Sequence, residues 1–268
     1  MVRPIIFYRG NDFEKSELSF AQRYFYCTNR FPDIKRDDFV IGRYSMYPYY
    51  NEYAKDIHYT GAKLINSYNQ HLYIADLQNY VSDLKELTPR TWKDLSVLPD
   101  KTAFVLKGET NSKKSSWQKN MFAANKEEAV KVHNRLVDDL LIGQQQIYTR
   151  EYVPLFKYMD GVNGMPVTKE FRFFVAYGEI VSGDFYWQNY VDDLNFKPDV
   201  SEVPVSFLQE VMKRVNNQCN FYTIDVAQTI NGDWIVIELN EGQQSGLSCN
   251  NPDVFYSKLY NVLKRKIM

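Results

Sequence analysis

Residues 221–240 read FYTIDVAQTINGDWIVIELN, two apolar runs rich in β-branched side chains on either side of Asn231-Gly232. Asn-Gly in this position is the strongest short-range signal of a β-hairpin with a two-residue loop. Counting back along both strands from that loop places Asp225 directly opposite Glu238, with Cβ atoms about 5 Å apart. Asn240, two residues beyond Glu238, lies on the same face of the hairpin.

Two opposed carboxylates destabilise a sheet unless one is protonated or a cation lies between them. Mg²⁺ suits this position because it prefers oxygen ligands and is usually held by one or two carboxylates and substrate phosphates. The hairpin therefore predicts a metal site formed by Asp225, Glu238 and Asn240. The alternative is a solvated sheet face whose acids add solubility, and a one-residue bulge would break the predicted pairing.

The composition excludes several classes of protein. The 268 residues carry 32 Lys and Arg against 33 Asp and Glu, a formal charge of -1, and 44% are hydrophobic. This content excludes general disorder, and a charge near zero gives no bulk electrostatic reason to expect nucleic acid. No apolar run approaches the roughly 20 residues of a membrane helix, so we expect no membrane partner and a cytoplasmic location. Three scattered cysteines fit neither a disulfide framework nor a zinc site.

Residues 1–98 alternate short apolar runs with amphipathic stretches, which is typical of a small parallel α/β domain. We expect strands at residues 4–8, 38–41 and 62–65 and helices at residues 47–58 and 70–87. The second helix would bury one face made of Leu72, Leu77, Val81 and Leu84. Because Pro89 cannot continue that helix, we expect a linker there and a domain boundary near residue 98.

Residues 99–268 predict a second domain of α+β type. Its first part contains an expected strand at 102–107, a polar loop at 109–120 and a helix at 125–141 that buries Val130, His133, Leu136, Val137 and Leu140. The remainder predicts antiparallel strands at 145–153, 169–177 and 179–187, a helix at 204–215, the hairpin, and a final helix that begins at Asn251-Pro252.

Four motifs in this order resemble the ATP-grasp fold. Residues 237–240 are similar to the metal-binding strand of that fold, and residues 103–107 resemble the strand whose lysine contacts the phosphates of ATP. Residues 150–153 are similar to its adenine hinge, and residues 170–175 to its strand with an acid-x-Arg motif. The likeness covers about residues 40 to 250 and is greatest to the divergent ATP-grasp proteins of bacteriophages, large viruses and some bacteria.

This resemblance implies an ATP-grasp fold with a small N-terminal parallel α/β domain, a lid at about residues 99–150, and ATP and Mg²⁺ as cofactors. It implies that Lys107 and Arg172 are catalytic and hold phosphates. Further nucleotide contacts are implied for Glu151, Tyr152, Val153 and Glu170, and metal coordination for Asp225, Glu238 and Asn240. The plainer alternatives are a solvated lysine at the end of a strand for Lys107 and an ion pair with Glu170 for Arg172.

Arg43 follows the predicted strand at residues 38–41. The ends of strands in open α/β sheets face the crevice where ligands bind. We therefore expect Arg43 to be a third catalytic residue that contacts phosphate or the acyl substrate, and an ordinary surface arginine is the alternative.

The resemblance implies an ATP- and Mg²⁺-dependent ligase that joins a carboxylate to an amine through an acyl phosphate. Its substrates would be small molecules or peptides. One alternative is a phosphotransferase of the same fold, and another is a nonenzymatic module that binds a nucleotide or single-stranded nucleic acid through Lys113, Lys114, Trp117 and Lys119. Residues 109–120 contain no glycine, whereas the phosphate-covering loop of the family is usually glycine-rich, so side chains would supply the donors.

Overall fold

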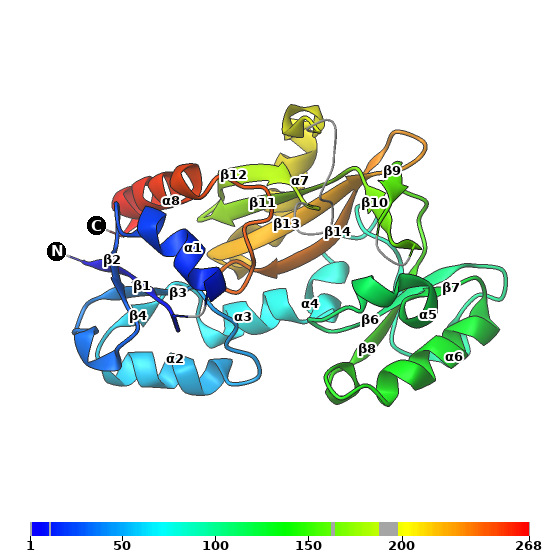
Figure 1. Ribbon diagram of the computed structural model, residues 1–268, viewed down its shortest axis with the longest axis horizontal. Coiled ribbons are helices and arrows are strands. Elements are labelled where there is room, and N and C mark those ends of the chain that lie inside the picture. The colour runs from blue at the N-terminus through cyan, green and yellow to red at the C-terminus, as the bar shows by residue number, and fades with distance from the viewer. Residues whose placement is uncertain (1, 11, 162–163, 188–197, 268) are drawn as a thin grey trace.

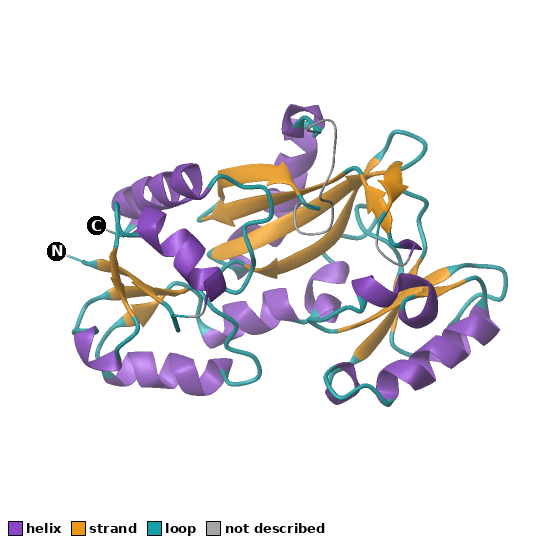
Figure 2. Cartoon of the chain, viewed as in Figure 1, coloured by secondary structure: helices purple, strands orange, loops and turns teal. Residues whose placement is uncertain are grey.

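The computed structural model describes the chain except for residues 1, 11, 162–163, 188–197 and 268. Within the described residues the strands form three four-stranded sheets and one two-stranded sheet. Figure 2 shows these sheets as separate groups, each flanked by helices. None of the described helices has the length and apolar character that crossing a membrane requires.

The first sheet is parallel, as the sequence predicts. Its strands lie in the order β2-β1-β3-β4, and all three pairings are parallel. Together with two helices it forms what we call the N-terminal unit, made of β1 (Pro4–Phe7), α1 (Asp12–Ala21), β2 (Tyr26–Thr28), β3 (Phe39–Gly42), α2 (Tyr50–Tyr59) and β4 (Lys63–Leu64). The sequence did not predict α1 or β2.

Two helices connect the N-terminal unit to the rest of the chain. They are α3 (Tyr68–Ala75) and α4 (Leu77–Val81), and they run below the central sheet in Figure 1. The prediction of one continuous helix over residues 70–87 is wrong because Asp76 has an extended backbone and caps α4 by accepting from the N–H of Gln78. The break rotates the two helices relative to each other, so Leu72 is exposed whereas Leu77 is buried.

The central sheet is antiparallel, with the order β12-β11-β13-β14. One face packs on α7 (Val205–Val215), α3 and α4 through side chains such as Phe171 and Phe173. On the other face, Phe174 and Phe221 pack on α8 (Pro252–Lys266) and on the N-terminal sheet. The strands are β11 (Glu170–Ala176), β12 (Glu179–Phe185), β13 (Phe221–Gln228) and β14 (Trp234–Glu241).

The hairpin of β13 and β14 confirms the predicted pairing of Asp225 with Glu238. Its loop, however, differs from the predicted one. Gln228 pairs with Trp234, which leaves a turn of three residues, 230–232, after the ladder closes between Thr229 and its partner. Gly232 has φ +91°, the left-handed conformation that glycine adopts without strain at the end of such a three-residue turn.

A β-bulge compensates for the longer turn. Val226 pairs with Val236, whereas Asp225 pairs with Glu238, so Ile237 is an additional residue on β14. The bulge shifts the register by one residue and restores the pairing that a two-residue loop would give. A bulge that was expected to break the carboxylate pair therefore creates it.

The third sheet belongs to what we call the lid unit, residues 91–151. Its strands lie in the order β5-β8-β6-β7, and Figure 1 shows it beside α5 and α6, away from the N-terminal unit. Its elements are β5 (Thr91–Trp92), β6 (Phe104–Gly108), α5 (Trp117–Asn120), β7 (Phe122–Ala123), α6 (Lys126–Val137) and β8 (Ile147–Glu151). A separate two-stranded sheet, β9 (Lys157–Asp160) with β10 (Pro166–Thr168), follows the lid unit.

Helix α6 begins as predicted but buries a different face. Asn125 caps it by accepting from the N–H of Glu128 at 3.0 Å. The buried residues are Ala129, Val132 and Leu136, whereas most of the predicted face, Val130, Val137 and Leu140, is exposed. The small Ala129 and the overlooked Val132 bring the helix close to the sheet, which turns the larger valines outward.

Candidate active site

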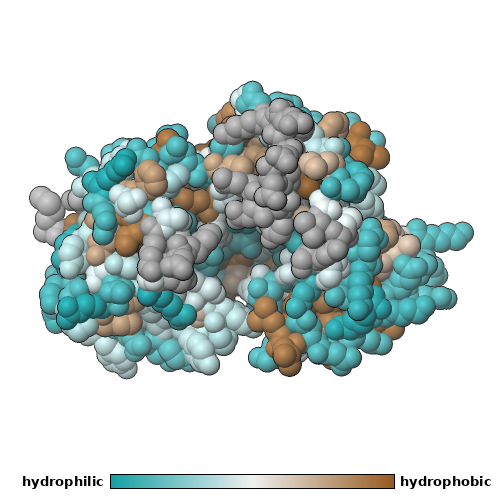
Figure 3. Space-filling model, viewed as in Figure 1, coloured by the Kyte–Doolittle hydropathy of each residue, from teal (hydrophilic) through white to brown (hydrophobic). Residues whose placement is uncertain are grey.

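A cleft between the central sheet and the lid unit contains most of the residues predicted to act on a ligand. Three adjoining pockets share lining residues along it, and we call them the first, middle and third compartments. Figure 3 shows the surface hollowed between the N-terminal unit and the lid unit. The order of the compartments follows the chain of shared residues, from the hinge at the end of β8 to the N-terminal unit.

The first compartment is apolar and has a volume of about 820 Å³, within the usual range for small-molecule sites. Among its lining residues are Val105, Trp117, Met121, Val153, Leu155, Ile235 and Ile237. The predicted hinge residues Glu151, Tyr152 and Val153 also line it.

The hinge offers fewer free backbone groups than expected. The N–H of Tyr152 donates to the carbonyl of Ala103 at 2.8 Å, so it is not available to a ligand. Pro154 has no N–H, and Val153 is therefore the hinge residue whose N–H remains. The Glu151 side chain is paired with Arg90 at 2.8 Å, which lowers the pKa of that carboxyl.

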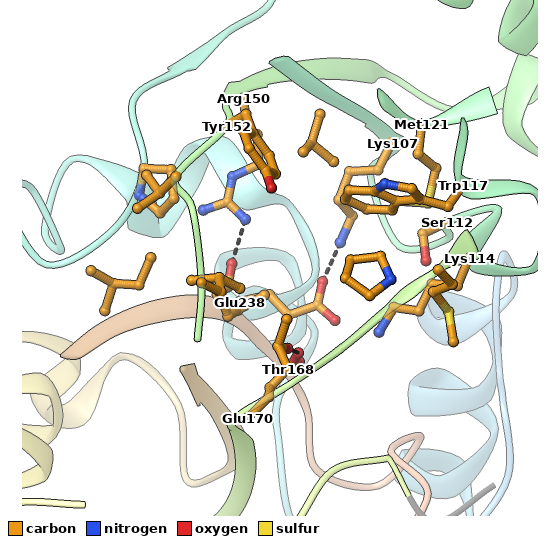
Figure 4. A pocket seen from close by; sticks show the side chains of 18 of the residues that line it. Lys107, Ser112, Lys114, Trp117, Met121, Arg150, Tyr152, Thr168, Glu170 and Glu238 are labelled. Atoms are coloured by element: carbon orange, nitrogen blue, oxygen red, sulfur yellow. Dashed lines mark hydrogen bonds and ion pairs between the residues drawn. The ribbon is translucent and has the colours of Figure 1, made fainter. Parts of the chain in front are cut away.

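Lys107 on β6 reaches across the cleft to Glu238 on β14. The two side chains form an ion pair, drawn as a dashed line in Figure 4, and both are largely buried. Burial alone would raise the pKa of Glu238, but the ammonium groups of Lys107 and Lys114 hold it well below its usual range. Lys107 is thus a cation inside the cleft and not a solvated lysine at the end of a strand.

Asp225 and Arg172 form a second ion pair on neighbouring strands. Arg172 donates from Nε and Nη2 to the two carboxylate oxygens at 2.8 and 2.6 Å, and Asp225 is fully buried. Burial raises the pKa of Asp225, although Arg172 acts to lower it. The alternative pairing of Arg172 with Glu170 is not observed, because β11 and β13 place Arg172 directly opposite Asp225.

Glu170 lies deep in the cleft with one oxygen unsatisfied. Its Oε2 accepts from the Thr168 hydroxyl at 3.3 Å, whereas Oε1 is buried without a hydrogen-bond partner. Burial raises its pKa to about 7, although the nearby Lys114 ammonium acts to lower it. A buried acceptor of this kind is a group that a bound ligand or cation can satisfy.

The predicted metal ligands share one face of the hairpin. Asn240 donates from Nδ2 to Asp225 at 3.2 Å, which leaves its carbonyl oxygen to act as a ligand. The described residues include no cluster of three His, Cys, Asp or Glu side chains around one point. Two carboxylates and one amide oxygen nevertheless fit Mg²⁺, which takes phosphate oxygens and water for its remaining positions.

Two cations of the cleft were not among the predicted site residues. Lys114 points into the cleft, where its Nζ donates to the Tyr186 hydroxyl at 2.5 Å, and Figure 4 shows it on the same side of the pocket as Trp117. Arg150 donates to Thr88 and to the carbonyl of Ile237, and its burial lowers its pKa. A charged residue inside the apolar run of β8 is the signal that could have identified Arg150.

The prediction for Arg43 is not supported, because its donors are used for structure. Its Nη1 donates to the carbonyls of Gly242, Gln243 and Ser245 at 2.9 to 3.2 Å, and its Nη2 pairs with Glu17 at 2.9 Å. Arg43 therefore fixes the loop that follows β14, and it lines none of the three compartments.

Solved structures with the same fold include several ligases. The chain superposes on D-cycloserine synthetase DcsG with a TM-score of 0.65 and 14% identity, covering 98% of this chain and 100% of the other. The ATP-grasp ligase PsnB, solved with a minimal precursor, Mg and ADP, gives a TM-score of 0.56 and 10% identity, with 98% of both chains covered. For D-alanine–D-alanine ligase from Bacillus anthracis, complexed with ATP, the TM-score is 0.59 and the identity 11%, with 99% of this chain and 96% of the other covered.

The sequence itself identifies the family. A comparison with curated proteins found no match. The family model of the ATP-grasp domain, clade family 3, matches residues 95–259, which is more than half of the chain. The compartments and most of the carboxylates and cations described above lie within or next to that match, and the chain belongs to this family of ATP-grasp domains.

Proposed function

We propose that the protein is an ATP- and Mg²⁺-dependent ligase that joins a carboxylate to an amine through an acyl phosphate. Membership of the ATP-grasp family supports ATP-dependent ligation of this general kind. The observation that carries the proposal is the middle compartment. There the carboxylates of Asp225 and Glu238 lie among three cations that face the cleft, Lys107, Lys114 and Arg172.

The first compartment would hold the adenine of ATP. Its walls are apolar, and Trp117 and Met121 from the lid unit face the apolar side chains of β14 across it. The N–H of Val153 would donate to the purine, because the neighbouring N–H of Tyr152 is already used. Glu151 would then act through the position of the hinge, since its carboxylate pairs with Arg90.

The middle compartment would hold the phosphates. Lys107 and Lys114 approach from the lid unit and Arg172 from the central sheet, so negative charge entering the cleft meets cations on two sides. Asp225, Glu238 and Asn240 would hold Mg²⁺, with Glu170 close by. When bound, the metal would neutralise phosphate charge and polarise the bond to the transferred phosphoryl group.

The reaction would proceed in two steps. A carboxylate oxygen of the substrate attacks the γ-phosphorus, the bond to ADP breaks, and the carboxylate becomes an acyl phosphate. The amine nitrogen then attacks the acyl carbon, inorganic phosphate leaves, and the nitrogen gives up a proton as the amide forms. Arg172 is placed to stabilise the negative charge that develops during both steps.

The nonenzymatic alternative has little structural basis. Lys113 pairs with Asp139 at 2.6 Å, whereas Lys114 and Trp117 line the first compartment. These residues therefore do not form the exposed basic and aromatic surface that single-stranded nucleic acid would need.

A trapping assay tests the proposed function. The protein is incubated with Mg²⁺-ATP, hydroxylamine and a panel of carboxylates, because hydroxylamine converts an acyl phosphate into a hydroxamate. We expect at least one carboxylate to give ADP and hydroxamate in equal amounts. If ADP instead accompanies a stable phosphorylated product that hydroxylamine does not trap, the protein is a phosphotransferase, and ligation is excluded.

A further inference from the structure

The third compartment continues the cleft beyond Asn240. It is bounded by Tyr47 and His71 on one side and by Leu141 of the lid unit on the other, and its volume is about 1050 Å³. Asn111 and Gln244 line both this compartment and the middle one. A molecule in the third compartment would therefore adjoin the atoms that react in the middle one.

The two compartments differ in charge. Lys107, Lys114 and Arg172 line the middle compartment, whereas none of the described residues that line the third is a lysine or an arginine. The third compartment has one acid in its wall, Glu241, which is buried. Glu241 accepts from the Gln243 amide and N–H, both at 2.8 Å, so it is held as part of the wall.

Two uncharged polar groups of this wall lack partners. Nε2 of Gln244 and Nδ1 of His71 are buried without a hydrogen bond, although Oε1 of Gln244 accepts from the N–H of Met46 at 3.3 Å. The His71 ring stacks on Tyr50 with centroids 3.7 Å apart, and burial lowers its pKa to about 4. Near neutral pH the wall therefore presents hydrogen-bonding groups without positive charge.

We propose that the third compartment binds the amine substrate, and that this amine carries no carboxylate of its own. The inference rests on the proposed ligase function. The carboxylate that becomes phosphorylated belongs beside Arg172, where the cations are. The amine attacks the acyl carbon from the side away from the departing phosphate, which is the side of the third compartment.

Charge complementarity gives the selectivity. A free amino acid would bring a second carboxylate into a wall that offers it no cation and already contains Glu241. An unpaired charge in a partly desolvated site is costly, whereas an amide or hydroxyl in the same place can bond to Gln244 and His71. We expect amino acid amides and amino alcohols to exceed the matching amino acids in kcat/KM by at least about tenfold.

The experiment compares matched amines with the carboxylate identified by hydroxylamine trapping. Each common L-amino acid is tested beside its amide and its amino alcohol, and amide product and ADP are both measured. Preference for the uncharged members supports the inference. If hydroxamate forms but the free amino acids react as well as their amides, or no uncharged amine reacts, the inference is overturned. Absence of hydroxamate with every carboxylate would instead overturn the ligase function itself.

A charge-gain variant tests the placement of the amine. Ser45 lines the third compartment and is exposed, so Ser45→Arg can add a cation there without burying it. We expect this variant to raise the kcat/KM of the amino acid relative to its amide by about tenfold. The control is Ser206→Arg, at an exposed position on α7 that lines none of the compartments. An unchanged ratio in Ser45→Arg would contradict the placement.

Discussion

At the scale of single residues, two adjacent lysines of the lid unit point in different directions. Lys114 reaches into the cleft beside Tyr186, with its Nζ 4.0 Å from the ring centre. Lys113 forms a partly exposed ion pair with Asp139. The sequence showed a basic loop here but could not tell which lysine points inward, because a loop without periodicity gives no face.

This difference yields a matched pair of variants. Lys114→Ala should weaken the binding of a nonhydrolysable ATP analogue by at least about tenfold, since a cation beside the phosphates is lost from the cleft. Lys113→Ala should change the affinity less than about twofold, because exposed ion pairs contribute little. Titration calorimetry with Mg²⁺ present measures both. Equal losses in the two variants would show that Lys114 has no special role in binding phosphate.

At the scale of elements, the hairpin explains which predictions succeeded. The Asp225–Glu238 pair was predicted correctly although the loop length was not, because the bulge at Ile237 offsets the third residue of the turn. Bulges depend on tertiary contacts, and the carbonyl of Ile237 accepts from Arg150 of the lid unit. A local reading of the strand has no access to that contact.

Short or weakly patterned elements were missed for related reasons. β2 has three residues, too few to show an alternation of period two. The face of α6 was misjudged because bulky valines were preferred over Ala129, although close packing on a sheet favours a small side chain. The long strand β11 was located well because most of its seven residues are apolar and all are buried.

The turn of the hairpin makes a prediction at this scale. Gly232→Ala should lower the free energy of unfolding by about 1 kcal/mol, because Gly232 has a positive φ that alanine adopts with strain. A new Cβ there meets no atom within 4 Å, so the cost would come from the backbone alone. Urea denaturation of Gly232→Ala and of the neighbouring control Asn231→Ala measures the difference. A destabilisation no larger than that of the control would contradict the observed turn.

At the scale of the whole molecule, a net charge near zero conceals a strong separation of charge. The cations of the cleft gather in the middle compartment, and the third compartment has none among its described residues. The N-terminal unit is joined to the end of β14 by buried polar contacts, such as those of Arg43 with the loop at residues 242–245. Contacts between distant segments of this kind cannot be predicted from one sequence, which is why Arg43 was assigned to the wrong role.

The pH dependence of stability tests one such buried contact. Burial lowers the pKa of His71 from 6.5 to about 4, so the stability that neutral His71 contributes is present above pH 6.5 and is lost as the pH falls toward 4. Wild-type protein should therefore lose about 2 kcal/mol more than His71→Phe between pH 7 and pH 5. Urea denaturation at both values measures this difference, with His58→Phe, at an exposed position, as the control. Equal losses in wild type and His71→Phe would contradict the burial of a neutral imidazole.

The central claim is that the hairpin carboxylates hold the metal that accompanies ATP. Titration calorimetry of a nonhydrolysable ATP analogue, with and without Mg²⁺, tests it in wild type and in Glu238→Gln, which keeps a hydrogen-bonding side chain opposite Lys107. We predict that Mg²⁺ tightens binding to the wild type by at least about tenfold and has little effect in the variant. Tightening by Mg²⁺ to the same extent in both proteins would contradict the account.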